Sequence, residues 1–195
     1  LKEDAVKLAI GILQSAKDPE HLLKHVKYLS VTNKSELQQQ GIKQLLAHPQ
    51  LQPLIEERFA ITWPSLEQMG AMPRGSLGFC MQQRQRYLGI NQLQIPLPTT
   101  DNEEDYVMYR CTICHDLHHL VLGLPISVAG EAADSAYSSI TKKMPLHVGL
   151  LATWLTHGLI EPEEHRMIWE GICFGARIGL DLSLIHISEP TRHDQ

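Results

Sequence analysis

The chain has 195 residues, of which 43% are hydrophobic and 20% are charged, and its formal net charge is −5. This length and hydrophobic content suffice for one well-buried core. The negative charge argues against nucleic acid as the main partner, because phosphate contacts need a surplus of lysine and arginine on one face.

Apolar residues recur at helical spacing along the chain, and no convincing alternating strand pattern appears. We therefore predict an all-α, single-domain fold over residues 1–181. Proline and serine residues mark several helix starts: Pro19 opens the second helix, and Ser35 caps the third. The helices are expected at 4–16, 19–29, 35–47, 53–59, 76–87, 105–122, 131–140, 145–159 and 162–180, with the main loop around Pro96 and Pro98.

The most informative motif is H-D-L-H-H at residues 115–119. Eleven residues separate its last histidine, His119, from Glu131. In a helix of about 100° per residue, His115, Asp116 and His119 fall within a wedge of about 100°, whereas His118 falls near −60°. Gly123 and Pro125 should end this helix, and Glu131 should return in the first turn of the next one.

These four side chains, His115, Asp116, His119 and Glu131, are the candidate metal ligands and catalytic residues. Two imidazoles and two carboxylates suit zinc first, with iron, cobalt or manganese as alternatives. Asp116 is either a ligand or a residue that orients an imidazole from outside the coordination sphere. The competing interpretation is a polar helix end whose histidines are merely solvated.

Cys111 and Cys114 precede His115 in a C-x-x-C-H pattern, which is also the attachment pattern of c-type haem. Haem attachment would use His115 as an axial ligand and would leave the rest of the metal motif unexplained. Four cysteines in a chain of this length are too few for a disulfide framework. We therefore expect Cys111 and Cys114 to be packed helix residues.

Residues 182–195 form a polar tail that resembles the translation of a sequencing-library adapter. We expect this segment to be non-native, to pack against nothing, and to replace a native continuation of the chain after Asp181. A natural polar tail that ends a helix at Pro190 is the alternative.

The H-D-x-x-H motif and its distant glutamate resemble the signature of the coenzyme Q (ubiquinone) biosynthesis family Coq-four. Other segments agree with that resemblance: the small-residue turn at 72–78, Arg110, and the later tryptophan-containing segments at 154–158 and 169–175. The likeness spans roughly residues 5–180.

The resemblance implies an all-α fold with a lipid-binding cavity, expected to open near the metal motif between the turn at 121–128 and the helix at 145–159. It also implies metal-dependent decarboxylation and hydroxylation at C1 of a polyprenyl-hydroxybenzoate, a lyase-type step of ubiquinone biosynthesis. In this interpretation His115, His119 and Glu131 hold the ion, with Asp116 beside them.

Further expectations from the resemblance concern partners and location. The expected partners are the polyprenylated quinone precursor, other quinone-biosynthesis proteins and a membrane that the protein contacts peripherally. The protein could also form a homodimer. The location would be the cytoplasmic face of the inner membrane in a bacterium, or the matrix side of the mitochondrial inner membrane in a eukaryote. Two rivals remain: a non-catalytic prenyl-lipid-binding scaffold with a structural metal, and a helical His-Asp phosphohydrolase.

Overall fold

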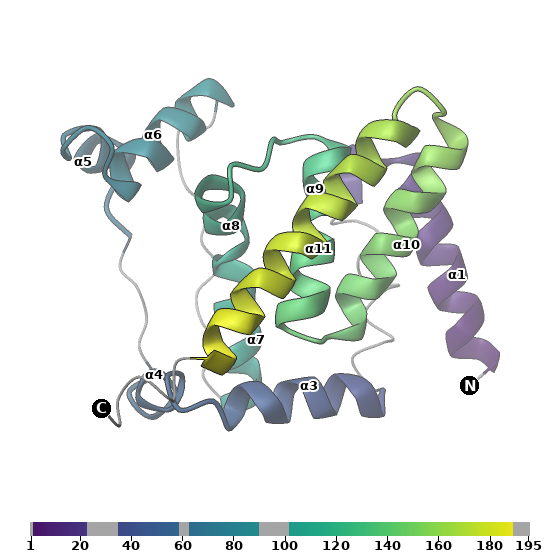
Figure 1. Cartoon of the computed structure of the whole chain (residues 1–195), viewed down its shortest axis with the longest axis horizontal. Helices are drawn as coiled ribbons and strands as arrows, with labels where there is room; N and C mark the ends of the chain where they lie inside the picture. The colour runs from purple at the N-terminus through teal and green to yellow at the C-terminus, as the bar shows by residue number, and fades with distance from the viewer. Residues whose placement is uncertain (1, 23–34, 59–62, 90–101, 189–195) are drawn as a thin grey trace. The chain divides into compact units, whose positions relative to one another are not determined.

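The computed structural model describes residues 2–22, 35–58, 63–89 and 102–188. Within these ranges the regular elements are all helical and no strand occurs, which confirms the all-α prediction (Figure 1). The chain divides into two compact units, residues 1–44 with 124–195 and residues 45–123. No helix in the described part of the chain is long and apolar enough to span a bilayer.

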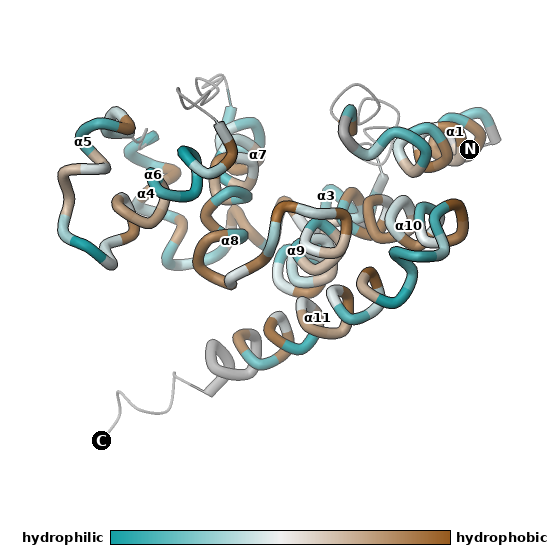
Figure 2. Tube along the Cα trace, turned by 90° about the horizontal axis from the view of Figure 1, so that it is seen from above, coloured by the Kyte–Doolittle hydropathy of each residue, from teal (hydrophilic) through white to brown (hydrophobic). Residues whose placement is uncertain are grey.

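Within the described residues, six helical elements lie wholly or mostly in the first unit. They are α1 (Lys2–Lys17), the short 3-10 helix η1 (Pro19–His21), α3 (Glu36–Leu46), α9 (Val128–Thr141), α10 (Pro145–Ile160) and α11 (His165–Ser188). Helix α9 packs against both α10 and α11, and α1 packs against α10. Along α11, hydrophobic and hydrophilic residues alternate as in an amphipathic helix with one face on a core (Figure 2).

The core of the first unit forms where α9, α10 and α11 meet. Trp154 is 1% exposed and packs with Ala132 and Ile168. Burial of an indole leaves its N–H in need of an acceptor, and Nε1 of Trp154 donates to Oγ of Ser135 at 3.0 Å. This hydrogen bond fixes α9 against α10.

Two glycines allow α11 to approach α9 closely. A Cβ at Gly171 would overlap the carbonyl oxygen of Ala129, and a Cβ at Gly175 would overlap that of Ala133. Because only a residue without a side chain fits such a backbone contact, glycine is required at both positions.

The helices described in the second unit are α4 (Gln52–Glu56), α5 (Leu66–Gly70), α6 (Leu77–Tyr87), α7 (Glu103–Ile113) and α8 (His115–Val121). Its core is formed by apolar and aromatic residues of α4 and α7: Ile55, Tyr106, Val107, Tyr109 and Ile113. Helix α6 packs against α5 and α8, and α7 packs against α4 and α8.

Several helix starts agree with the sequence. Backbone N–H groups donate to the capping hydroxyls of Ser35 and Ser76, so α3 and α6 begin where predicted. The short helix α5 was not predicted, although Ser65 and Gln68 form a reciprocal capping box at its start. The region around Pro96 and the predicted second helix beyond Leu22 lie outside the described residues.

One predicted helix is wrong in its extent. Residues 105–122 were expected to form one helix, but α7 ends at Ile113, and Cys114 separates it from α8. The hydroxyl of Thr112 donates to the carbonyl of Met108 at 3.0 Å, but Thr153 makes the same kind of bond inside the uninterrupted helix α10, so this bond alone does not end α7. The interruption lies before His115, so the phase of the motif is unaffected.

Helix α11 continues through Ser188, beyond the predicted end at residue 180. Side chains from residue 183 onward lie outside the described residues. The expectation that the tail packs against nothing therefore stays a prediction.

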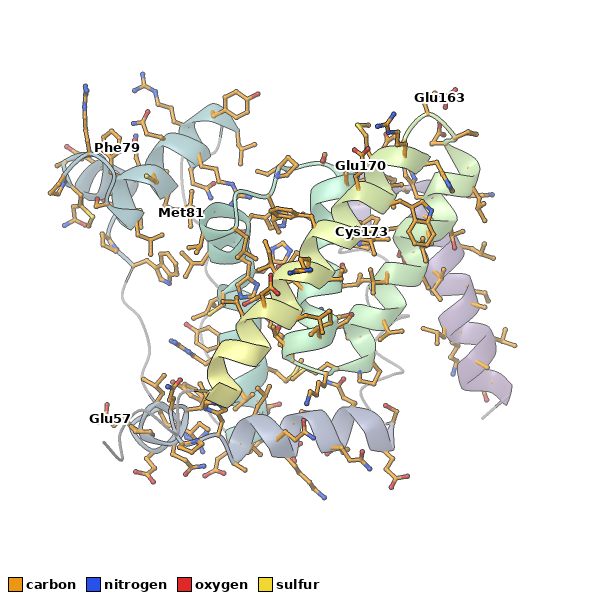
Figure 3. All side chains as sticks on the ribbon, viewed as in Figure 1. Glu57, Phe79, Met81, Glu163, Glu170 and Cys173 are labelled. Atoms are coloured by element: carbon orange, nitrogen blue, oxygen red, sulfur yellow. The ribbon has the colours of Figure 1, made fainter. Side chains whose placement is uncertain are left out.

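The contact between Gly175 and α9 yields a stability prediction. Gly175→Ala should destabilise the protein by roughly 1–2 kcal/mol, because overpacking costs more than the helix propensity that alanine regains. Thermal denaturation should show a melting temperature lower by about 2–4 °C per kcal/mol. Cys173→Ala is the matched control, since Cys173 is exposed on the same helix (Figure 3). Equal stability of the two variants would contradict the close packing.

Candidate metal centre

The two histidines of the motif lie one helical turn apart on α8. Their ring centroids are 4.7 Å apart and the rings are tilted by 58°. His119 is 2% exposed, whereas His115 is partly exposed. Since residues four apart lie on one helical face, the short helix presents both imidazoles in the same direction.

The chain after α8 turns as the sequence predicts. Gly123 has a φ of +68°, the left-handed conformation that ends many helices. Pro125 follows in the loop, and a Cβ at Gly130 would overlap the carbonyl oxygen of Pro125. The turn into α9 is therefore tight and depends on a glycine at residue 130.

Helix α9 begins earlier than predicted, at Val128 rather than at Glu131. Its N-cap is Ser127, whose hydroxyl accepts a hydrogen bond from the backbone N–H of Gly130 at 3.3 Å. Glu131 still lies in the first turn. A negative charge is favourable there because the N-terminal end of a helix carries a partial positive charge.

Within the continuous stretch 115–131, His115, His119 and Glu131 form a group that could hold a metal ion. One ligand atom from each residue lies within 4.8 Å of the others. Two nitrogen donors and one carboxylate fit a divalent ion of the zinc or iron type, with further coordination positions left for substrate or water. His118 is not part of the group, as the helical phase predicts.

Asp116 is not part of this group either, but it contacts one of its members. Its Oδ1 lies 3.4 Å from Nδ1 of His115. The hydrogen bond with His115 lowers the pKa of Asp116 below its usual value, although burial acts in the opposite direction. A carboxylate beside an imidazole can orient the ring and keep its other nitrogen basic.

Arg84 adds a contact that sequence reasoning missed. Its Nη1 donates to the backbone carbonyl of Asp116 at 2.7 Å. This bond ties α6 to α8 at the motif itself. Helical periodicity could not have revealed it, because the two residues are 32 positions apart and belong to different helices.

Cys111 and Cys114 are both partly buried and pack against the apolar core of the second unit. That is the environment expected of packed helix residues rather than of an exposed attachment site.

Comparison with known proteins places the sequence in a family. The model of the family "Coenzyme Q (ubiquinone) biosynthesis protein Coq4" matches residues 5–181, which include the complete metal motif. The chain belongs to the Coq4 family.

Relatives within the Coq4 family are distant. The mitochondrial ubiquinone biosynthesis protein COQ4 of Coccidioides immitis is 30% identical over 129 residues, which are 64% of this chain and 44% of that protein. The mitochondrial COQ4 homologue of Homo sapiens is 27% identical over 110 residues, 53% of this chain and 40% of that protein. The chain thus matches less than half the length of these relatives.

A solved structure supports the fold. The crystal structure of a Nostoc punctiforme protein, provisionally assigned to ubiquinone biosynthesis, superposes with a TM-score of 0.75. The match covers 91% of this chain and 83% of the Nostoc chain at 20% sequence identity. At that identity the similarity establishes the fold of this Coq4 family member and no more.

The metal centre yields a binding prediction. His119→Ala and Glu131→Ala should each weaken zinc binding by more than the roughly 10–100-fold that is typical of changes outside the coordination sphere. His118→Ala should bind as the wild type does, because His118 lies outside the ligand group. Equilibrium dialysis followed by elemental analysis measures the bound metal. Zinc binding by Glu131→Ala at the wild-type affinity would show that Glu131 is not a ligand.

Proposed function

We propose that this protein acts in ubiquinone biosynthesis, or in the synthesis of a related prenylquinone, as a metal-dependent lyase. Its substrate would be a polyprenyl-hydroxybenzoate, and the reaction would release the carboxylate at C1 as carbon dioxide and put a hydroxyl in its place. Because this exchange is a two-electron oxidation, it requires a co-substrate of the dioxygen or peroxide class that supplies both the oxidising equivalents and the hydroxyl oxygen. The observation that carries the proposal is the group of His115, His119 and Glu131 inside the segment that matches the family.

Each residue of the motif has one role in this proposal. His115, His119 and Glu131 would hold the ion, and Asp116 would orient the His115 ring through its contact at Nδ1. When bound, a divalent ion would supply Lewis-acid chemistry that binds the substrate carboxylate or adjacent phenolic oxygen and stabilises the charge developing as carbon dioxide leaves. Burial of His119 excludes water from one side of the site, which strengthens electrostatic interactions there.

A lipid-linked substrate implies further partners. The polyprenyl tail would occupy an apolar cavity and would require peripheral contact with the membrane that holds the precursor. In a bacterium that membrane would be the inner membrane, and in a eukaryote the mitochondrial inner membrane. Contacts with other quinone-biosynthesis proteins, and pairing of two copies of the chain, belong to the same proposal.

The proposed reaction is tested in a strain that lacks the corresponding pathway protein. The wild-type chain should restore quinone synthesis, whereas His119→Ala and Glu131→Ala should not, because each removes a metal ligand. His118→Ala should restore synthesis fully. Quinone extracted from the cells is measured by chromatography, together with the carboxylated precursor that should accumulate in the inactive variants.

The same experiment distinguishes an enzyme from a non-catalytic lipid-binding scaffold. A scaffold with a structural or dispensable metal would restore quinone synthesis in every motif variant that still folds. Restoration by both His119→Ala and Glu131→Ala, with their folding verified by circular dichroism, would therefore reject the catalytic proposal in favour of the scaffold.

A further inference from the structure

Two arginines of the second unit lie beside a buried tyrosine. Arg58 follows α4, and its Cζ lies 5.7 Å from the centroid of the Tyr106 ring. Arg110 lies one helical turn after Tyr106 on α7, so both share a face of that helix. Tyr106 is fully buried in the core of this unit.

Each guanidinium has a buried donor that meets no acceptor. The Nη1 atoms of Arg58 and Arg110 are inaccessible to solvent and have no hydrogen-bond partner among the described residues. Both arginines are partly exposed as whole residues, but a buried donor of a charged group that meets no acceptor is still unfavourable. Two such donors on adjacent elements indicate a site for a group that carries negative charge.

The local charge balance points the same way. Burial raises the pKa of the Tyr106 hydroxyl, whereas the nearby charges of Arg110 and Arg58 lower it. Glu57, which is exposed at the end of α4 (Figure 3), acts in the raising direction. In the part of the chain described, no salt bridge joins either arginine to a carboxylate.

Arg58 directly follows the C-cap of α4 and has a φ of +49°, the left-handed conformation in which many helices end. From this position its guanidinium makes a cation–π contact with the Tyr106 ring. The planar N–H groups of an arginine suit a planar or tetrahedral oxyanion.

We propose that Arg58 and Arg110 bind an oxyanion, a phosphate or carboxylate group, beside Tyr106. The site lies within the second unit and uses none of the metal ligands, so it is independent of the proposed enzymatic function. Bidentate contacts from arginine are the usual means by which proteins bind such groups.

The test is a thermal-denaturation titration with inorganic phosphate at constant ionic strength, with chloride as the balancing anion. A ligand that binds the native state raises the melting temperature in a saturable manner. The titration is carried out with a chelator and repeated in the His119→Ala variant, so that phosphate bound to a metal ion does not contribute. A second arm uses a short-chain phosphatidate, which distinguishes a lipid headgroup from free phosphate by its tighter binding.

Wild-type protein should show saturable stabilisation by phosphate, by phosphatidate or by both. Arg58→Gln and Arg110→Gln should each weaken that binding by roughly tenfold or more, as expected for hydrogen bonds to a charged group. Arg86→Gln is the matched control, because Arg86 is exposed on α6.

Arg58→Lys and Arg110→Lys keep the charge while losing the bidentate fork, and they replace the glutamine variants if those fail to fold. Weaker binding in the lysine variants supports the site. Stabilisation by neither ligand in the wild type overturns the proposal, as does an unchanged response in the arginine variants.

Discussion

A metal ion is held only where donor atoms converge, and convergence in this protein depends on the turn that joins α8 to α9. Helical phase alone places His115 and His119 on one face, but it cannot bring back a carboxylate from sixteen residues further along the chain. That return requires Gly123 in the left-handed conformation and Gly130 against the carbonyl of Pro125. A side chain at either glycine would oppose the turn.

Helix α9 gives Glu131 a rigid base. Immediately after the carboxylate, Ala132 and Ala133 are buried in the core of the first unit. The close contact with Gly175 of α11 and the hydrogen bond from Trp154 to Ser135 fix the following turn. A functional carboxylate on such a helix is positioned more accurately than one on a loop. The packing of α9 in the core therefore fixes the position of Glu131 in its first turn.

Much of this arrangement could be predicted from local sequence. Helix starts, helix ends and the phase of the histidines each depend on a few neighbouring residues, so they can be predicted from a single segment. Examples are the starts at Ser35 and Ser76 and the end at Gly123 and Pro125. The capping box at Ser65 was an equally local signal that was overlooked.

Other features depend on tertiary contacts that no local pattern encodes. The bond from Arg84 to the Asp116 carbonyl joins separate helices, and the cation–π contact of Arg58 with Tyr106 joins a turn to a distant helix. The interruption at Cys114 also has no local signal, because residues 110–114 contain neither proline nor glycine.

The most direct test of this account is X-ray absorption spectroscopy of the zinc-loaded protein. The account predicts scattering from two imidazoles and a carboxylate oxygen, with nitrogen and oxygen neighbours at about 2.0–2.2 Å. A sulfur neighbour at about 2.3 Å would assign the ion to Cys111 or Cys114 instead. Coordination without imidazole would likewise contradict the central claim that His115, His119 and Glu131 form the metal centre.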